Sequence, residues 1–237
     1  MFFRNTRTQR RIREVSMTLF RLFGVPVIAD MSTAFLLLLV GLNLSGVFAM
    51  FPLVLAIAFI VAAGLLLFFG LILHEFAHVL VARHFGIRTD AVHLWGFGAA
   101  AAIQHEPYRP SHQFLIGLAG PLTSFAVGIV YAVVGMLSES YLSDTMVALL
   151  ALSAVWQVVL GIFNLIPFYP MDGGRVLHSI LWKVKGNWWA TSTSRALGKW
   201  GGIALAIYGF ASMFILLPFG SFWLIFIGWM LYSVNSR

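Results

Sequence analysis

Long apolar blocks are the feature that most constrains what this chain can fold into. A helix that crosses a bilayer needs about 20 apolar residues, and blocks of that kind recur along the chain. Hydrophobic residues make up 60% of the 237 residues and charged residues only 10%, whereas a soluble domain carries about 25% charged residues. The pattern therefore predicts an integral membrane protein, organised as one membrane domain over residues 1–237.

The apolar blocks predict about six transmembrane helices, at approximately 33–49, 53–83, 113–137, 145–163, 200–217 and 221–232. The mixed stretch Thr89–Ile103 predicts short strands, and Leu22–Ala29 predicts a further edge strand. After a short helix at Arg175–Trp182, we expect a polar loop that runs to Lys199. The predicted fold is an all-α polytopic membrane protein with a small membrane-associated β-sheet or hairpin.

The distribution of charge predicts how these helices are oriented. With the N-terminus in the cytoplasm, every Lys and Arg falls on the cytoplasmic side, while Glu139 and Asp144 fall on the opposite side. Cytoplasmic loops of membrane proteins carry an excess of Lys and Arg, so we expect a multi-pass protein of the cell membrane with both termini in the cytoplasm. This pattern assigns the net charge of +7 to membrane flanks and argues against a nucleic-acid partner.

The second predicted span contains the motif His74-Glu75-Phe76-Ala77-His78. Two His at positions i and i+4 lie on one face of a helix, one turn apart, and this spacing lets both imidazoles reach one zinc ion. Glu75 follows the first of them and is placed to act as a general base on water. Ionisable groups are costly inside an apolar helix, so their clustering here indicates metal binding.

A catalytic zinc ion usually has three protein ligands, and the chain contains no Cys. Asp172, which follows the fourth predicted span, is the best third ligand. The predicted topology ends the second and fourth spans at the same face of the membrane, so we expect an active site toward the cytoplasmic side. An N-cap or an Asp-Gly turn remains an alternative role for Asp172.

Taken in order, the motif at 74–78 and the stretch Asn164…Pro167…Met171-Asp172-Gly173-Gly174 resemble the site-2 protease family of intramembrane zinc metalloproteases, in its six-span prokaryotic branch. The resemblance covers about residues 21–181. Between the two motifs the family often carries a Gly-Pro…Asn segment, and this chain has Ser124 where Asn is common. We expect that departure to leave the metal site untouched.

The resemblance implies a role for each matching residue. His74, His78 and Asp172 are the implied Zn²⁺ ligands, and Glu75 is the implied general base. Asn164 is implied to position substrate or to stabilise an intermediate, although termination of the helix before the following proline explains this Asn equally well.

The implied function is hydrolysis of peptide bonds in or near transmembrane segments of membrane-anchored proteins. The implied partners are such a substrate and the lipid bilayer, and we expect Thr89–Ile103 to receive the unwound substrate as an added strand. Two other functions stay open. One is a membrane metal-ion transporter, because intramembrane His and Asp mark ion pathways. The other is an inactive protease-like scaffold. One cluster near one face, with its His, Glu and Asp intact, favours the protease.

Overall fold

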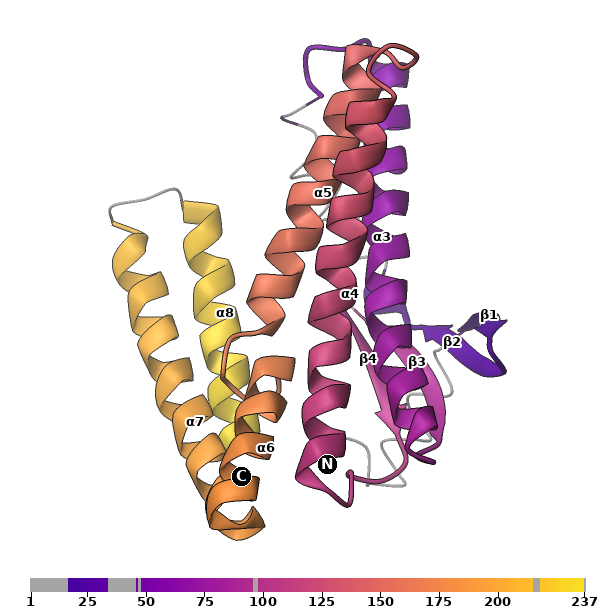
Figure 1. The fold of residues 1–237 in the computed structure, drawn as a ribbon. Coiled ribbons are helices and arrows are strands. Elements are labelled where there is room, and N and C mark those ends of the chain that lie inside the picture. Colours follow the sequence, from indigo (N-terminus) through magenta and orange to yellow (C-terminus); the bar gives the residue numbers. More distant parts are fainter. Residues whose placement is uncertain (1–16, 34–45, 47, 96–97, 215–217, 237) are drawn as a thin grey trace. The chain divides into compact units, whose positions relative to one another are not determined.

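The structure, a computed structural model, describes residues 17–33, 46, 48–95, 98–214 and 218–236. The described chain is mostly helical and contains one four-stranded sheet (Figure 1). It divides into two compact units, the first formed by Met1–Glu106 with Leu122–Gly161 and the second by Pro107–Pro121 with Ile162–Arg237.

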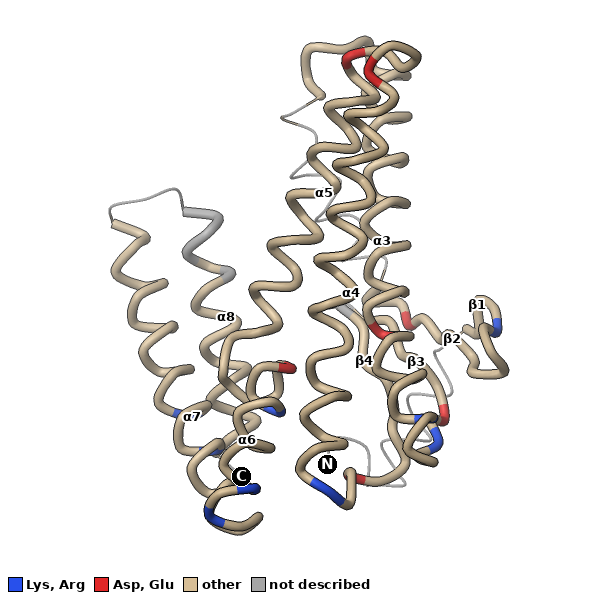
Figure 2. Tube along the Cα trace, viewed as in Figure 1, with Lys and Arg blue, Asp and Glu red and all other residues tan. Residues whose placement is uncertain are grey.

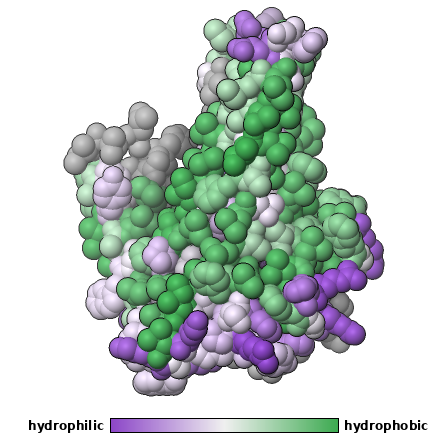
Figure 3. All heavy atoms as spheres, in the orientation of Figure 1, coloured by the Kyte–Doolittle hydropathy of each residue, from purple (hydrophilic) through white to green (hydrophobic). Residues whose placement is uncertain are grey.

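Three helices in the described part of the chain are long and apolar enough to cross a membrane. They are α3 (Leu53–His84), α4 (Pro110–Leu137) and α5 (Asp144–Asn164). Their large apolar side chains remain exposed, so the surface of this helical region is largely hydrophobic (Figure 3). These helices confirm the second, third and fourth predicted spans as apolar helices of membrane-spanning length.

The sheet belongs to the first unit and has the order β1-β2-β3-β4. Its strands are β1 (Met17–Leu22), β2 (Val25–Ala29), β3 (Thr89–Trp95) and β4 (Gly98–Ile103). β1 with β2 and β3 with β4 pair antiparallel, whereas β2 and β3 pair parallel. A parallel pair needs a long crossover between its strands, and α3 lies in that connection.

The strands expected within Thr89–Ile103 are confirmed, and so is a strand within Leu22–Ala29, which is β2. Its expected position at the edge of the sheet is wrong. β2 lies between β1 and β3, and β1 is the outer strand. The reversal uses Phe23 and Gly24, with φ of 50° and 82°. Two successive positive φ values are typical of the tight turns that join hairpin strands. Asn, Asp or Gly usually occupies such a position, so the Phe gives no sequence signal for this turn.

The sheet packs on α3 and thereby orients the motif at 74–78. Ile72, Phe76 and Val79 of α3 form a buried apolar cluster with side chains from β2 and β3. An α-helix turns by about 100° per residue, so His74 and His78 lie on the face of α3 opposite to this cluster. Glu75 lies between the two faces.

The two ends of α3 differ in their charged neighbours. At its N-terminal end, Ala56 and Ala63 pack with Leu149 near the start of α5, so the acidic connection between α4 and α5 lies at that end (Figure 2). Arg83 lies in the last turn of α3, at its other end. Within the first unit, the α4–α5 connection with Glu139 and Asp144 therefore lies at the end of α3 opposite to Arg83.

The second unit contains three further helices, α6 (Asp172–Lys185), α7 (Asn187–Ser212) and α8 (Pro218–Asn235). The polar loop expected to run to Lys199 is wrong, because α7 already begins at Asn187. Gly186, with φ of 88°, is the residue between α6 and α7. The segment that follows buries Ala190, Ser194 and Gly198, whose spacing of four residues is that of one helix face. Small residues on this face conceal its amphipathic character in the sequence.

The count of six transmembrane helices stays a prediction. α7 and α8 overlap the fifth and sixth predicted spans but are not among the described helices of sufficient length and hydropathy. Most of the first predicted span, residues 34–45 and 47, lies outside the described residues.

Candidate metal centre

The motif at 74–78 is built on α3 of the first unit. Its two imidazoles are almost fully buried, with 1% of His74 and 3% of His78 exposed. Their ring centroids lie 5.1 Å apart, as expected for side chains one helical turn apart. Two buried imidazoles on one helix face can each offer one nitrogen to a common ion.

Ser124 on α4 contacts the first of these histidines. Its Oγ lies 2.8 Å from Nδ1 of His74, and the residue is fully buried. Ser124 thus contacts one of the predicted ligands, and the expectation that Ser in place of Asn leaves the metal site untouched stays a prediction. The two residues are 50 positions apart in the sequence, and only the packing of α4 beside α3 brings them together.

The carboxylate of Glu75 is held by the sheet. Its Oε2 accepts a hydrogen bond of 3.1 Å from the backbone N–H of Ala101 in β4. β4 is an outer strand, and alternate N–H groups of such a strand point away from its neighbour. The bond to Glu75 identifies Ala101 as one of these outward-pointing groups, so the carboxylate lies beside the open edge of the sheet.

Asp172 is the first residue of α6 in the second unit and is buried. The N-cap of α6 is Met171, without a side-chain capping bond, so the structure does not support the N-cap alternative for Asp172. A Cβ on Gly173 would lie 2.1 Å from the backbone oxygen of Leu165, and one on Gly174 would lie 2.4 Å from the backbone nitrogen of Tyr169. The glycines let the preceding loop pack against the turn that carries Asp172.

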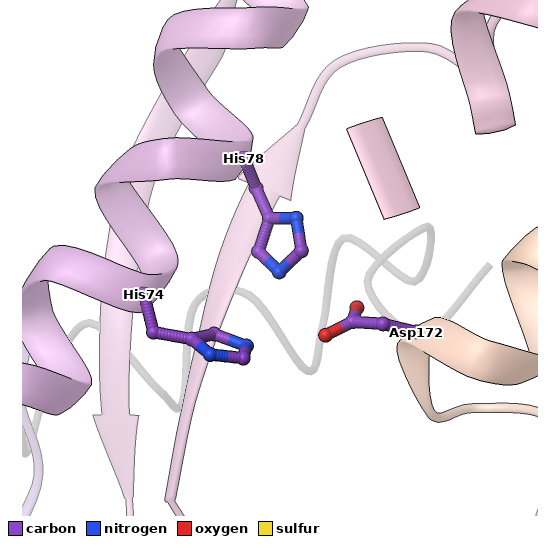
Figure 4. Close-up of side chains that lie close together, drawn as sticks. All are labelled: His74, His78 and Asp172. Atoms are coloured by element: carbon purple, nitrogen blue, oxygen red, sulfur yellow. The ribbon is translucent and has the colours of Figure 1, made fainter. Parts of the chain in front are cut away.

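His74, His78 and Asp172 form the potential metal-binding group found among the described residues. Each offers one ligand atom, and these atoms all lie within 4.8 Å of one another (Figure 4). Two imidazole nitrogens with one carboxylate oxygen are a donor set of catalytic zinc sites. The burial of all three side chains also fits a bound cation, because buried charged groups are usually paired or coordinate metals. The residues present therefore fit zinc.

Asn164 is the last residue of α5 and is half-buried. It is not a member of the metal-binding group. The helix ends at this residue and Pro167 follows three positions later, so its position agrees with helix termination, and its role toward substrate stays a prediction.

The apolar helices, the four-stranded sheet and the buried donor set define a membrane-embedded metalloprotein. The chain belongs to Peptidase family M50, which it matches over residues 58–148 and 134–208. This confirms the resemblance to site-2 proteases. A solved structure, the site-2 protease from Methanocaldococcus jannaschii, is similar with a TM-score of 0.62 and 30% identity, over 92% of this chain and 95% of that one.

Two relatives carry names of the same kind. A zinc metalloprotease of Methanocaldococcus jannaschii is 32% identical over 85% of this chain and 56% of its own length. A Synechocystis protein, named as a candidate zinc metalloprotease, is 36% identical over 89% of this chain and 56% of its own length. The chain thus spans about half the length of these relatives.

Proposed function

We propose that this chain is a zinc metalloprotease of the membrane that hydrolyses peptide bonds in or near transmembrane segments of membrane-anchored proteins. The observation that carries the proposal is the buried group formed by His74, His78 and Asp172, with Glu75 adjacent in the sequence. The first three residues hold Zn²⁺, and Glu75 is the general base. Membership of Peptidase family M50 supports the same reading.

The proposed chemistry divides between the metal and the chain. When bound, zinc supplies Lewis-acid chemistry that polarises a carbonyl group and makes water more acidic. Glu75 accepts a proton from the attacking water and passes it to the leaving amine. Ala101 restrains that carboxylate through its N–H, so the base is held at the edge of the sheet rather than free to rotate.

The open edge of β4 is the proposed receptor for substrate. A peptide bond in a helix is enclosed by the hydrogen bonds of its own helix, so the substrate must unwind before cleavage. An unwound segment gains new backbone hydrogen bonds by adding to a free sheet edge, and β4 offers such an edge beside Glu75. Asn164 is proposed to help position the same segment.

The proposed arrangement in the membrane follows from charge. We propose six transmembrane helices, both termini in the cytoplasm, and a site toward the cytoplasmic side, with residues 1–237 acting as one protease domain. The position of Arg83 at the end of α3 opposite to the α4–α5 connection, which contains no Lys or Arg, supports this orientation, because positively charged residues are retained in the cytoplasm. Lipid is then the partner of the exposed apolar helices.

Transport of metal ions and an inactive scaffold are less well supported. Transport requires several exchangeable sites along a route across the bilayer, whereas the described residues offer one potential metal-binding group. A scaffold has no need of a carboxylate held beside the ligand pair.

The proposal is tested by cleavage of a single-span substrate by the purified full chain in detergent. Glu75→Gln removes the base and should abolish cleavage while zinc remains bound. Glu139→Gln is the matched control, because Glu139 is an exposed acid in the α4–α5 connection. Cleavage by the parent and by Glu139→Gln but not by Glu75→Gln supports the proposal. Equal cleavage by Glu75→Gln, or none by the zinc-loaded parent, contradicts it.

A further inference from the structure

Ser124 is a fully buried hydroxyl residue in an apolar helix, with 0% of its surface exposed. A buried hydroxyl costs free energy unless it forms a hydrogen bond. Here the hydroxyl meets a ring nitrogen, since its Oγ lies 2.8 Å from Nδ1 of His74. Both residues belong to the first compact unit, so this contact is made within one packed body.

The contact has a consequence for which nitrogen of His74 can bind metal. A neutral imidazole carries a proton on one nitrogen and a lone pair on the other. The nitrogen with the lone pair binds metal. The hydrogen bond made by the protonated nitrogen determines which of the two carries the lone pair. When Nδ1–H donates to Oγ of Ser124, the lone pair is on Nε2 and the ring cannot rotate freely.

We propose that Ser124 is a positioning residue that selects Nε2 of His74 as the metal-binding nitrogen and holds its ring in the orientation that zinc requires. This inference rests on the proposed zinc site. Ser124 acts through His74 and is therefore not a catalytic residue. Loss of such an outer partner typically lowers metal affinity by about 10- to 100-fold.

The chain provides a matched control in Ser153 of α5. It is also almost fully buried in an apolar helix, but its Oγ donates to the backbone oxygen of Leu149 in the same helix at 2.9 Å. Ser153→Ala removes a buried hydroxyl of the same size without touching a histidine contact. Any general effect of deleting a buried serine hydroxyl appears in both variants.

The experiment measures zinc affinity of the full chain in detergent by competition with a chromophoric chelator, for the parent, Ser124→Ala, Ser124→Asn and Ser153→Ala. We expect Ser124→Ala to bind zinc about 10- to 100-fold more weakly and Ser153→Ala to match the parent. Ser124→Asn retains a hydrogen-bonding side chain and should recover most of the affinity. The visible spectrum of bound Co²⁺ should change in Ser124→Ala and not in Ser153→Ala.

The outcomes separate this inference from the proposed function. Parent-like zinc affinity and Co²⁺ spectrum in Ser124→Ala, or equal losses in Ser124→Ala and Ser153→Ala, overturn the positioning role. If Ser124→Ala fails to fold, the inference is judged on Ser124→Asn, where a folded protein with tenfold or greater loss of affinity overturns it. A parent that binds no zinc overturns both. A parent that binds zinc without cleaving overturns the protease activity alone.

Discussion

At the residue scale, the glycines after Asp172 explain how this acid is held. Gly173 is buried, and a Cβ there would lie 2.1 Å from the backbone oxygen of Leu165 and 2.6 Å from that of Ile166. Backbone atoms cannot move aside as the end of a side chain can. The glycine is thus required by the close approach of the loop to the first turn of α6.

Gly173→Ala is therefore expected to destabilise the protein by about 1–3 kcal/mol, as overpacking of a buried site does, and to weaken zinc binding because the turn with Asp172 shifts. Gly64→Ala is the control, since a Cβ on Gly64 of α3 meets no atom within 4 Å. Thermal unfolding in detergent and zinc content measure both effects. A Gly173→Ala protein as stable as Gly64→Ala contradicts this account of the turn.

His93 in β3 gives a prediction on pH. Burial lowers the pKa of His93 below its ordinary value, and the carboxylate of Asp30 partly opposes the shift. The unfolded state, with a His pKa of about 6.5, then takes up the proton first as pH falls. The contribution of neutral His93 to stability is complete above about pH 6.5 and is lost as pH falls toward the lowered folded pKa.

His93→Gln should remove this part of the pH dependence. Chemical unfolding of metal-free parent and variant across mildly acidic pH measures the difference, because the two proteins differ only at His93. The parent should lose more stability than the variant on acidification. Identical pH profiles would show that the environment of His93 does not disfavour its charged form.

At the element scale, β4 holds the carboxylate of Glu75, the proposed general base, through one N–H group. Ala101→Pro removes the donor to Glu75 because Pro has no N–H. Cleavage should fall by at least about tenfold, as general-base catalysis contributes 10²–10⁴-fold, while zinc content stays at the parental level. Rates of cleavage and bound zinc, measured on the same samples, check this prediction.

Ala99→Pro is the matched variant for this test. Ala99 lies two positions away in β4, so its N–H points to the same edge by the alternation of the ladder. A much smaller loss of cleavage in Ala99→Pro supports a specific contact with Glu75. Equal losses of cleavage in the two variants show instead that the whole edge of β4 is needed, as addition of a substrate strand requires. Unchanged cleavage in both variants contradicts both proposed roles of β4, the contact with Glu75 and the binding of substrate.

The elements differ in how far the sequence predicts them. α3, α4 and α5 are predictable because lipid-facing helices expose apolar residues in long runs. α7 begins earlier than predicted, because its N-terminal half buries small residues such as Ala190 and Gly198, which carry a weak apolar signal. β1 is missed because its turn begins with Phe23 in place of the usual Asn or Gly.

At the scale of the whole molecule, charge predicts the orientation in the membrane. The chain has no Cys, so a single introduced Cys reports the side of the membrane on which it lies. Ser140→Cys, exposed in the α4–α5 connection, should react with a membrane-impermeant thiol reagent on intact cells. Lys185→Cys, exposed at the end of α6, should react only after lysis. The reverse pattern contradicts the orientation.

The candidate site divides in the same way between what the sequence predicts and what it does not. His74, Glu75 and His78 are predictable because helical spacing alone relates them. The roles of Ser124 and Ala101 are not, since they depend on α4 packing beside α3 and on β4 lying against it. Asp172 is predictable because it follows the fourth span at the face where the second span ends, but its burial beside tightly packed glycines has no sequence signal of its own.

Bound zinc per chain, in the purified parent and in Asp172→Ala, tests the central claim most directly. The account predicts about one zinc ion per parent chain, because three protein ligands are usual for a catalytic site, and far less than one in Asp172→Ala. Full zinc in Asp172→Ala, or none in the parent, contradicts a centre made of His74, His78 and Asp172.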